Sequence, residues 1–157
     1  MIRAAIFFAL CLQISIEVQS KIASADEPTK DLLNAVQGSW QRTFKRGDST
    51  IRVIKKIDEN WETVSYMIGD DVVQSHRVEF DVRSTPLGNV FSSQRKEFLA
   101  GPNAGKKTSE TGSYLFKLEG NQWYEVHRMM PGDQGEPWIN VYTRSDSIGR
   151  SDQDSPK

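Results

Sequence analysis

Cysteine is almost absent from the chain, because the single residue of this type is Cys11, inside an apolar N-terminal segment. That segment is too short and too interrupted by polar residues to span a membrane, which takes roughly 20 apolar residues. Arg3 precedes the apolar run and the small residues 23–25 follow it, an arrangement typical of a secretory signal peptide. We predict a signal peptide over residues 1–25 and an exported protein, periplasmic or secreted. Cleavage after Ser20 and an uncleaved anchor are the alternatives.

Removal of that peptide would leave an exported chain without any thiol. Such a chain has no disulfide, no zinc–thiolate site and no cysteine nucleophile. About 130 residues would remain, enough for one ordinary domain that buries a sufficient hydrophobic core. The predicted domain, residues 26–144, therefore depends on core packing for its stability.

An excess of one charge is also missing, since 20 lysines and arginines face 21 aspartates and glutamates. Nucleic acid is therefore not an expected partner, because binding a phosphate backbone takes a cluster of positive charge. No G-x-S-x-G nucleophile motif, phosphate-binding glycine loop or dinucleotide fingerprint occurs. Carboxylates are expected mainly on the polar faces of strands or in turns, so no acid–base pair is predicted. We expect a non-catalytic protein without a cofactor.

What the chain does contain is a short helical pattern followed by many strand patterns. The pattern of residues 26–37 predicts a linker followed by about two helical turns, and Gly38 can end this helix. The residues that follow are rich in aromatic and β-branched side chains, which favour strands. Eight strands are predicted, over residues 39–45, 50–57, 61–68, 72–83, 90–99, 109–119, 122–130 and 138–144. Residues 145–157 are polar and predicted to be a disordered tail.

The strands alternate apolar and polar residues, as antiparallel strands with one buried face do. Val78, Phe80 and Val82 alternate with charged residues, and short Gly- and Asp-containing turns join the segments. Two arrangements fit eight such strands, a sandwich and a closed up-and-down barrel. Short sequential hairpins favour the barrel, which also removes exposed sheet edges. The predicted fold class is all-β, an eight-stranded antiparallel up-and-down barrel with a short N-terminal helix.

The stretch "LLNAVQGSWQRTF", in which Gly38-x-Trp40 follows a short helix and opens the first strand, resembles the lipocalin pattern of the calycin superfamily. More narrowly, it resembles small lipocalin-like domains found in exported bacterial proteins. The resemblance covers about residues 30–144. It implies that Gly38 lets the chain bend into the barrel, that Trp40 plugs the closed end, and that Arg144 packs over the indole. We expect structural roles for these three residues.

Strict alternation of hairpins sorts the loops between the two ends of the barrel. The longest loops, 100–107 and 131–137, fall together at the end opposite Trp40 and predict an open mouth there. An interior of eight strands holds packed side chains or one small ligand. The candidate ligand-binding residues near that mouth are Phe44, Tyr66, His76, Phe98, Tyr114, His127, Met129 and Trp138. The alternative is that these residues only fill the core.

His76 and His127 share their strand faces with inward apolar residues, so both are expected to point into the barrel from different walls. A functional pair could orient a polar ligand or bind a metal or haem. Without a third ligand the metal signal is weak, and no metal site is predicted. The alternative is two unrelated histidines with ordinary hydrogen bonds.

These patterns predict an exported, monomeric barrel that binds a small apolar or amphipathic molecule in its interior without catalysis. No stable membrane span is expected. The alternative is a module with a filled barrel that docks a protein or a component of the cell envelope. A third possibility is an enzyme that uses His76 or His127.

Overall fold

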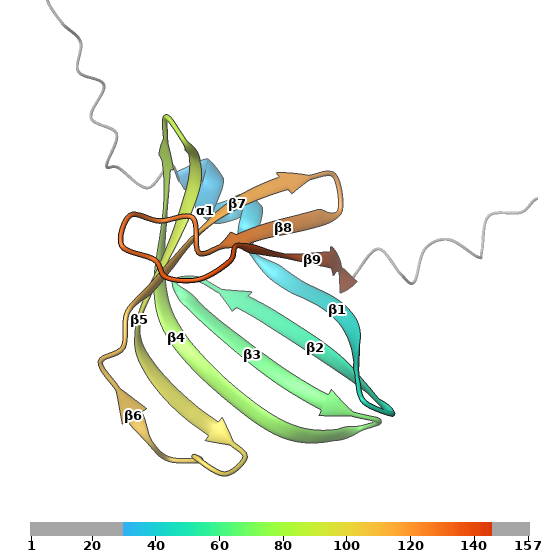
Figure 1. Cartoon of the computed structure of the whole chain (residues 1–157). Helices are drawn as coiled ribbons and strands as arrows, with labels where there is room; N and C mark the ends of the chain where they lie inside the picture. The colour runs from blue at the N-terminus through green and yellow to red at the C-terminus, as the bar shows by residue number, and fades with distance from the viewer. Residues whose placement is uncertain (1–29, 146–157) are drawn as a thin grey trace, which may run out of the picture.

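The computed structural model describes residues 30–145, and Figure 1 shows their arrangement. One helix precedes a series of strands. The elements are α1 (Lys30–Val36), β1 (Gly38–Arg46), β2 (Ser49–Asp58), β3 (Trp61–Ile68), β4 (Asp71–Thr85), β5 (Gly88–Ala100), β6 (Lys107–Thr108), β7 (Gly112–Glu119), β8 (Gln122–His127) and β9 (Trp138–Arg144). No helix within residues 30–145 is long and apolar enough to cross a membrane.

The strands form a closed, antiparallel up-and-down barrel, so the predicted fold class is confirmed. Eight strands, β1–β5 and β7–β9, make up the barrel, and the two-residue β6 pairs with the outer part of β5. The barrel closes where β1 meets β9, through Trp40 opposite Arg144 and Gln41 opposite Thr143. Elsewhere each barrel strand pairs with the next one along the chain, apart from the short detour through β6.

Alternation of side chains explains why these segments close around one core. In β2 the buried positions include Ile51, Val53 and Ile57, and in β4 they include Phe80 and Val82. Because successive strand residues point to opposite faces, alternate apolar residues line the barrel interior. Burying them is the main favourable contribution to the folding of a chain of this kind.

The structure differs from the prediction mainly at the ends of strands. The predicted strand 122–130 ends at His127 because Arg128 has a left-handed backbone, φ 59°. The predicted strand 109–119 begins at Gly112, because residues 109–111 form no strand and connect it to β6, which ends at Thr108. The predicted signal peptide, and the predicted tail beyond Ser145, lie outside the described residues.

One end of the barrel is closed by α1 and by Trp40, which is fully buried. The indole Nε1 of Trp40 donates a hydrogen bond to the backbone oxygen of Val36, 2.8 Å away. The Arg144 guanidinium lies over the indole, 4.1 Å from the ring centroid, and donates hydrogen bonds to the backbone oxygens of Gln37 and Ala35. Arg144 therefore joins the last strand, the plug and the turn that follows the helix.

Aromatic side chains fill the half of the barrel next to this plug. The rings of Trp40 and Trp123 meet edge to face with centroids 5.3 Å apart. Phe80, Phe91 and Tyr114 stack in a row, with successive centroids 4.6 and 4.7 Å apart. Such pairs add to the free energy gained by burial alone. Packed side chains therefore fill the interior of the closed half.

Substitution of Gly38 by alanine should destabilise the fold by about 1–3 kcal/mol, since Gly38 has φ +104°, a region that L-residues rarely occupy. An added Cβ would also lie 3.1 Å from Nη1 of Arg144. Urea unfolding measures the loss. Ser39→Ala, at the next position, is the control and should change stability by less than about 0.5 kcal/mol. Equal stability of the two variants would contradict this role of Gly38.

Candidate functional site

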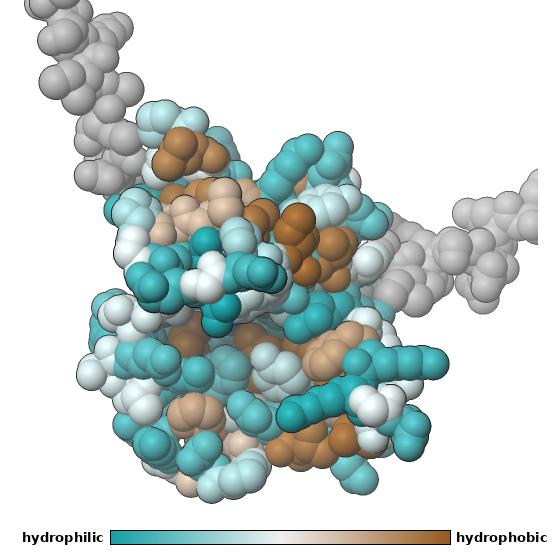
Figure 2. Space-filling view, viewed as in Figure 1, coloured by the Kyte–Doolittle hydropathy of each residue, from teal (hydrophilic) through white to brown (hydrophobic). Residues whose placement is uncertain are grey.

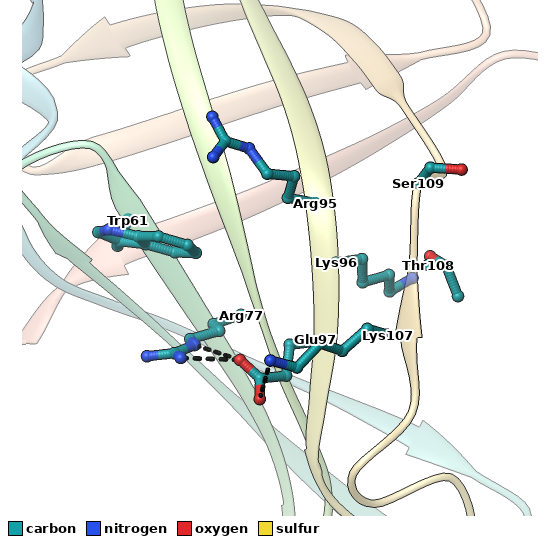
Figure 3. Close-up of a pocket in the computed structure, with 8 residues that line it drawn as sticks. All are labelled: Trp61, Arg77, Arg95, Lys96, Glu97, Lys107, Thr108 and Ser109. Carbon is teal, nitrogen blue, oxygen red and sulfur yellow. Dashed lines mark hydrogen bonds and ion pairs between the residues drawn. The ribbon is translucent and has the colours of Figure 1, made fainter.

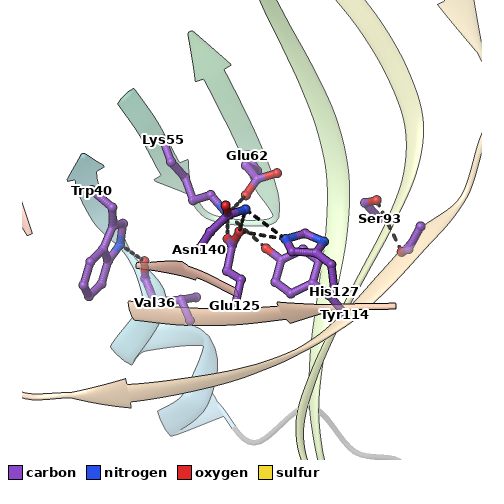
Figure 4. A network of polar contacts seen from close by, with 10 residues as sticks. Val36, Trp40, Lys55, Glu62, Ser93, Tyr114, Glu125, His127 and Asn140 are labelled. Carbon is purple, nitrogen blue, oxygen red and sulfur yellow. Dashed lines mark hydrogen bonds and ion pairs between the residues drawn. The ribbon is translucent and has the colours of Figure 1, made fainter. Parts of the chain in front are cut away.

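The barrel interior contains a buried lysine, Lys55 of β2, which is 2% exposed. Its ammonium lies 2.7 Å from Oε1 of Glu62 and also forms an ion pair with Glu125 (Figure 4). It donates a third bond, of 3.0 Å, to the hydroxyl of Tyr114. A lysine ammonium has three donors. Each of them can therefore be directed to a different oxygen in this site.

Aromatic rings surround the same ammonium. Its Nζ lies 4.6 to 5.5 Å from four ring centroids, those of Phe91, Tyr114, Trp123 and Tyr142. Rings at this distance attract a cation through their electron-rich faces. The site resembles the aromatic cages that bind ammonium ligands, except that the protein's own lysine occupies it. No external ligand can reach this position while Lys55 remains there.

Glu125 of β8 is the better satisfied of the two carboxylates. Beyond its ion pair with Lys55, its Oε2 lies 3.1 Å from Nε2 of His127 and 3.3 Å from Nδ2 of Asn140. Burial alone would raise the pKa of Glu125, but Lys55 and the hydrogen bond with His127 outweigh it and lower the pKa to about 2. Glu125 is therefore an ionised, fixed partner for Lys55.

Glu62 of β3 is less well satisfied, although it is only 6% exposed. Within residues 30–145 its carboxylate has no partner other than Lys55. Burial raises the pKa of Glu62 above its ordinary value, despite the nearby ammonium, and the charge of Glu125 adds to the increase. One ammonium thus serves two carboxylates, and Glu62 is the one left with unused capacity to accept hydrogen bonds.

A cavity of about 170 Å³ adjoins Glu62, on the side of the barrel where β5 separates from β7. Its lining combines charged and polar side chains with a few apolar ones. The lining residues are Glu62, His76, Val78, Phe91, Ser93, Lys96, Glu110, Thr111, Gly112 and Tyr114. Thr111 and Gly112 are exposed, whereas Glu62 and Tyr114 are buried. The cavity therefore reaches from the surface to the charged network.

His76 of β4 supplies a second unsatisfied group to this cavity. Its Nδ1 is buried and has no hydrogen-bond partner among the described residues. Burial lowers the pKa of His76 to about 4, and the positive charges of Lys96 and Lys55 contribute. At neutral pH the ring is uncharged, so one nitrogen carries a proton and the other accepts hydrogen bonds.

The depressed pKa of His76 makes a prediction for the pH dependence of stability. The unfolded state takes up a proton near pH 6.5, before the folded state does, so the stability provided by a neutral His76 is present above that pH. It is lost as the pH falls from 6.5 toward about 4. In His76→Phe, urea unfolding should show a smaller decrease in stability between pH values of about 7 and about 5 than in the wild type. An unchanged decrease would contradict the buried, neutral state of His76.

Most of the predicted ligand-binding residues lie in two rows of rings. Tyr66, His76 and Phe98 form one row, with centroids 6.5 and 6.1 Å apart. Tyr114, His127 and Trp138 form the other, with centroids 4.7 and 4.9 Å apart. Of these, only His76 and Tyr114 line the cavity beside Glu62.

Phe44, Met129 and Trp138 are not among the residues that line this cavity. Phe44 is half-buried, with the guanidinium of Arg42 4.7 Å from its ring centroid. Met129 lies beyond the end of β8 and is 51% exposed, which separates it from the interior faces of the strands. Trp138 begins β9 and is 44% exposed.

The opening also differs from the expected mouth at loops 100–107 and 131–137. The cavity is bordered instead by Glu110, Thr111 and Gly112, just before and at the start of β7. A broader hollow lies below the segment that joins β8 and β9, and apolar side chains show inside it (Figure 2). Both features place an approach to the interior on the side of the barrel.

The expectation that carboxylates lie on polar strand faces was wrong for Glu62 and Glu125, and no sequence argument identified Lys55. A signal was present, because Lys55 has the same parity as the buried Val53 and Ile57. Likewise, Glu125 has the parity of Trp123 and His127. A charged residue at an inward position is a reason to expect a buried partner. Glu125 and His127 also form the paired carboxylate and imidazole that the sequence did not predict.

Among the described residues, no group of three or more histidine, cysteine, aspartate or glutamate side chains is placed to hold a metal ion. The chemistry available at the site is thus that of a buried ammonium, two carboxylates, two imidazoles and phenol groups. These can orient a ligand by hydrogen bonds and charge. Comparison with protein-family models, curated proteins and solved structures gave no match for this chain.

Proposed function

We propose that the barrel binds one small amphipathic molecule in the cavity between Glu62, His76 and the gap that separates β5 from β7. One observation carries the proposal: two buried and incompletely satisfied polar groups, the Glu62 carboxylate and Nδ1 of His76, line the same cavity. Buried polar groups without a partner are rare in folded proteins, because each costs free energy. A ligand that supplies the missing hydrogen bonds would recover this free energy.

The lining indicates what the ligand is like. Glu62 accepts hydrogen bonds or attracts positive charge, so the polar end of the ligand carries a donor or a cationic group. Val78, Phe91 and the ring of Tyr114 provide apolar surface for the remainder. The volume of about 170 Å³ limits the enclosed part to a small group. This favours an amphipathic molecule over a purely apolar one.

The proposal includes a lipocalin-like relationship, export and a monomeric state. The closed barrel with Trp40 at its base and Arg144 over the indole supports the relationship. The segment 1–25 supports export. No acid–base step is assigned to Glu125 and His127, and the pair acts by holding Lys55 and the Tyr114 side of the cavity in place.

Native mass spectrometry of the purified protein tests this function, by detecting a small molecule that co-purifies with it. Thr111→Trp would place a large ring at the exposed rim of the cavity and should abolish the bound species. Ser113→Trp is the matched control, because Ser113 is exposed and bonds to Ser92 on the outer face. Retention of the species in both variants, or its absence from the wild type, would contradict binding in this cavity.

A second candidate function is a docking module, and the outer face of β7–β9 favours it. Leu115, Val126 and Ile139 are neighbours across these three strands on that face. Leu115 and Val126 are half-buried, and Ile139 is 63% exposed. Clustered apolar side chains at the surface occur at protein interaction sites. If this function holds, Ile139→Glu should abolish a complex recovered by crosslinking in the native host, and Thr111→Trp should leave it intact.

A further inference from the structure

A groove of about 430 Å³ crosses the outer surface of β3–β6, on the opposite side of the wall from the interior cavity. Figure 3 shows Trp61 at one side of the groove and Arg95 at another, with Arg77, Glu97 and Lys107 along its lower edge. Volumes of this size suit small-molecule sites. The groove belongs to the outer face because Trp61 alternates with the inward Glu62, and Arg77 with the inward Val78.

Charged side chains are fixed around the groove by ion pairs. Glu97 accepts hydrogen bonds from Arg77, whose Nη2 is 2.7 Å away, and lies 3.5 Å from Nζ of Lys107. The hydrogen bond from Arg77 holds the pKa of Glu97 below its ordinary value, so Glu97 stays an acceptor. The Arg77 guanidinium also lies over the Trp61 ring, 5.0 Å from its centroid. The guanidinium therefore covers one face of the indole, and a sugar ring would have to pack on the opposite face.

Arg95 adds an unusual backbone feature to the groove. It has φ 52°, at the place where the register between β4 and β5 shifts. Such bulges redirect side chains and are frequent next to binding sites, where left-handed non-glycine residues also cluster. Here the bulge directs the guanidinium to Glu79, with which it forms an ion pair on the outer face.

The combination of groups identifies the ligand chemistry. A carboxylate would not strengthen the binding of a simple anion. Glu97 and the guanidinium groups together offer hydrogen-bond acceptors and donors, which suit a ring that bears hydroxyl groups. The indole supplies a flat apolar surface for the C–H face of such a ring. Lys96 also lines the interior cavity and pairs with Glu110. The other three cationic side chains of the groove, Arg77, Arg95 and Lys107, pair with two carboxylates, those of Glu79 and Glu97. One excess positive charge remains, which suits a single acidic group.

We propose that this outer groove binds an acidic saccharide, with a sugar ring on Trp61 and its carboxylate or sulfate group between Arg95 and Lys107. Guanidinium and ammonium donors recognise a carboxylate and a sulfate group in the same way. Lys96 lines both the outer groove and the interior cavity, whereas Trp61, Arg95 and Lys107 line the outer groove and not the cavity. Substitutions of these three residues therefore test the outer site separately from the interior site.

Isothermal titration with three saccharides tests the proposal: an oligogalacturonate, a sulfated galactan oligomer and a neutral galactan oligomer. At least one acidic saccharide should bind, with a Kd lower than that of the neutral one by a factor of about ten or more. The Trp61 indole N–H signal should shift in NMR spectra. Trp61→Ala should abolish binding, and Trp138→Ala, which removes another partly exposed indole, should leave it unchanged.

Arg95→Gln combined with Lys107→Gln should bring the affinity for the acidic saccharide down to that for the neutral one. If Trp61→Ala does not fold, this double variant still tests the proposal. A polyglutamate peptide is the charge control. Equal binding of the peptide, equal binding of the neutral saccharide, or no binding of either acidic saccharide would overturn the proposal.

Discussion

Replacement of Lys55 by methionine should lower the free energy of unfolding by about 3–5 kcal/mol, the cost of leaving buried charges without their partner. The ammonium is the common partner of Glu62 and Glu125, both of which are buried. Without it, two carboxylates would face each other among aromatic rings. Chemical unfolding at neutral pH measures the loss.

Lys56→Met is the matched control, because Lys56 is the next residue of β2 and is exposed on the outer face. Its substitution should change stability by less than about 0.5 kcal/mol. A third variant, which adds Glu62→Gln and Glu125→Gln to Lys55→Met, should recover much of the lost stability, since it removes the unpaired charges. If Lys55→Met and Lys56→Met were equally stable, the ion pairs would not contribute as described.

Substitution of Trp40 by alanine should cost about 3–5 kcal/mol, as expected for the removal of a large ring from a packed core. The indole is fully buried, and its loss would also remove the hydrogen bond to Val36 and the surface on which Arg144 lies. Thermal and urea unfolding measure the effect, which should appear whether or not a ligand is bound.

Trp138→Ala serves as the comparison for this prediction. Trp138 is 44% exposed and stacks on His127 and Arg128, so its loss should cost about 0.5–1.5 kcal/mol. A Trp40→Ala protein that melts like the Trp138→Ala protein would refute the role of Trp40 as the plug.

The fold could be predicted because its signals are local. Alternation in β4, short turns and the Gly38-x-Trp40 sequence each depend on residues close together in the chain. The ends of strands were less predictable, since they depend on individual backbone angles. Arg128 ends β8 through its left-handed conformation. The predicted strand continued to Met130 because the residues after Arg128 are apolar.

The site could be predicted only in part, because its contacts cross the barrel. The hydrogen bonds of Lys55 join residues 59 and 70 positions apart, and no local pattern specifies that β2 faces β7 and β8. The inward direction of His76 and His127 followed from strand parity, whereas their partners did not. Tyr114 and His76 were found as interior aromatic residues, but the carboxylates that give the cavity its polarity were not.

A crystal structure of the protein with its co-purified molecule tests the central claim most directly. We expect density for the molecule between Glu62, His76 and Ser93, with its polar end hydrogen-bonded to Glu62 and with Lys55 still between the two carboxylates. Density on the outer surface alone, or a cavity that holds only water while the molecule is bound elsewhere, would contradict the interior site.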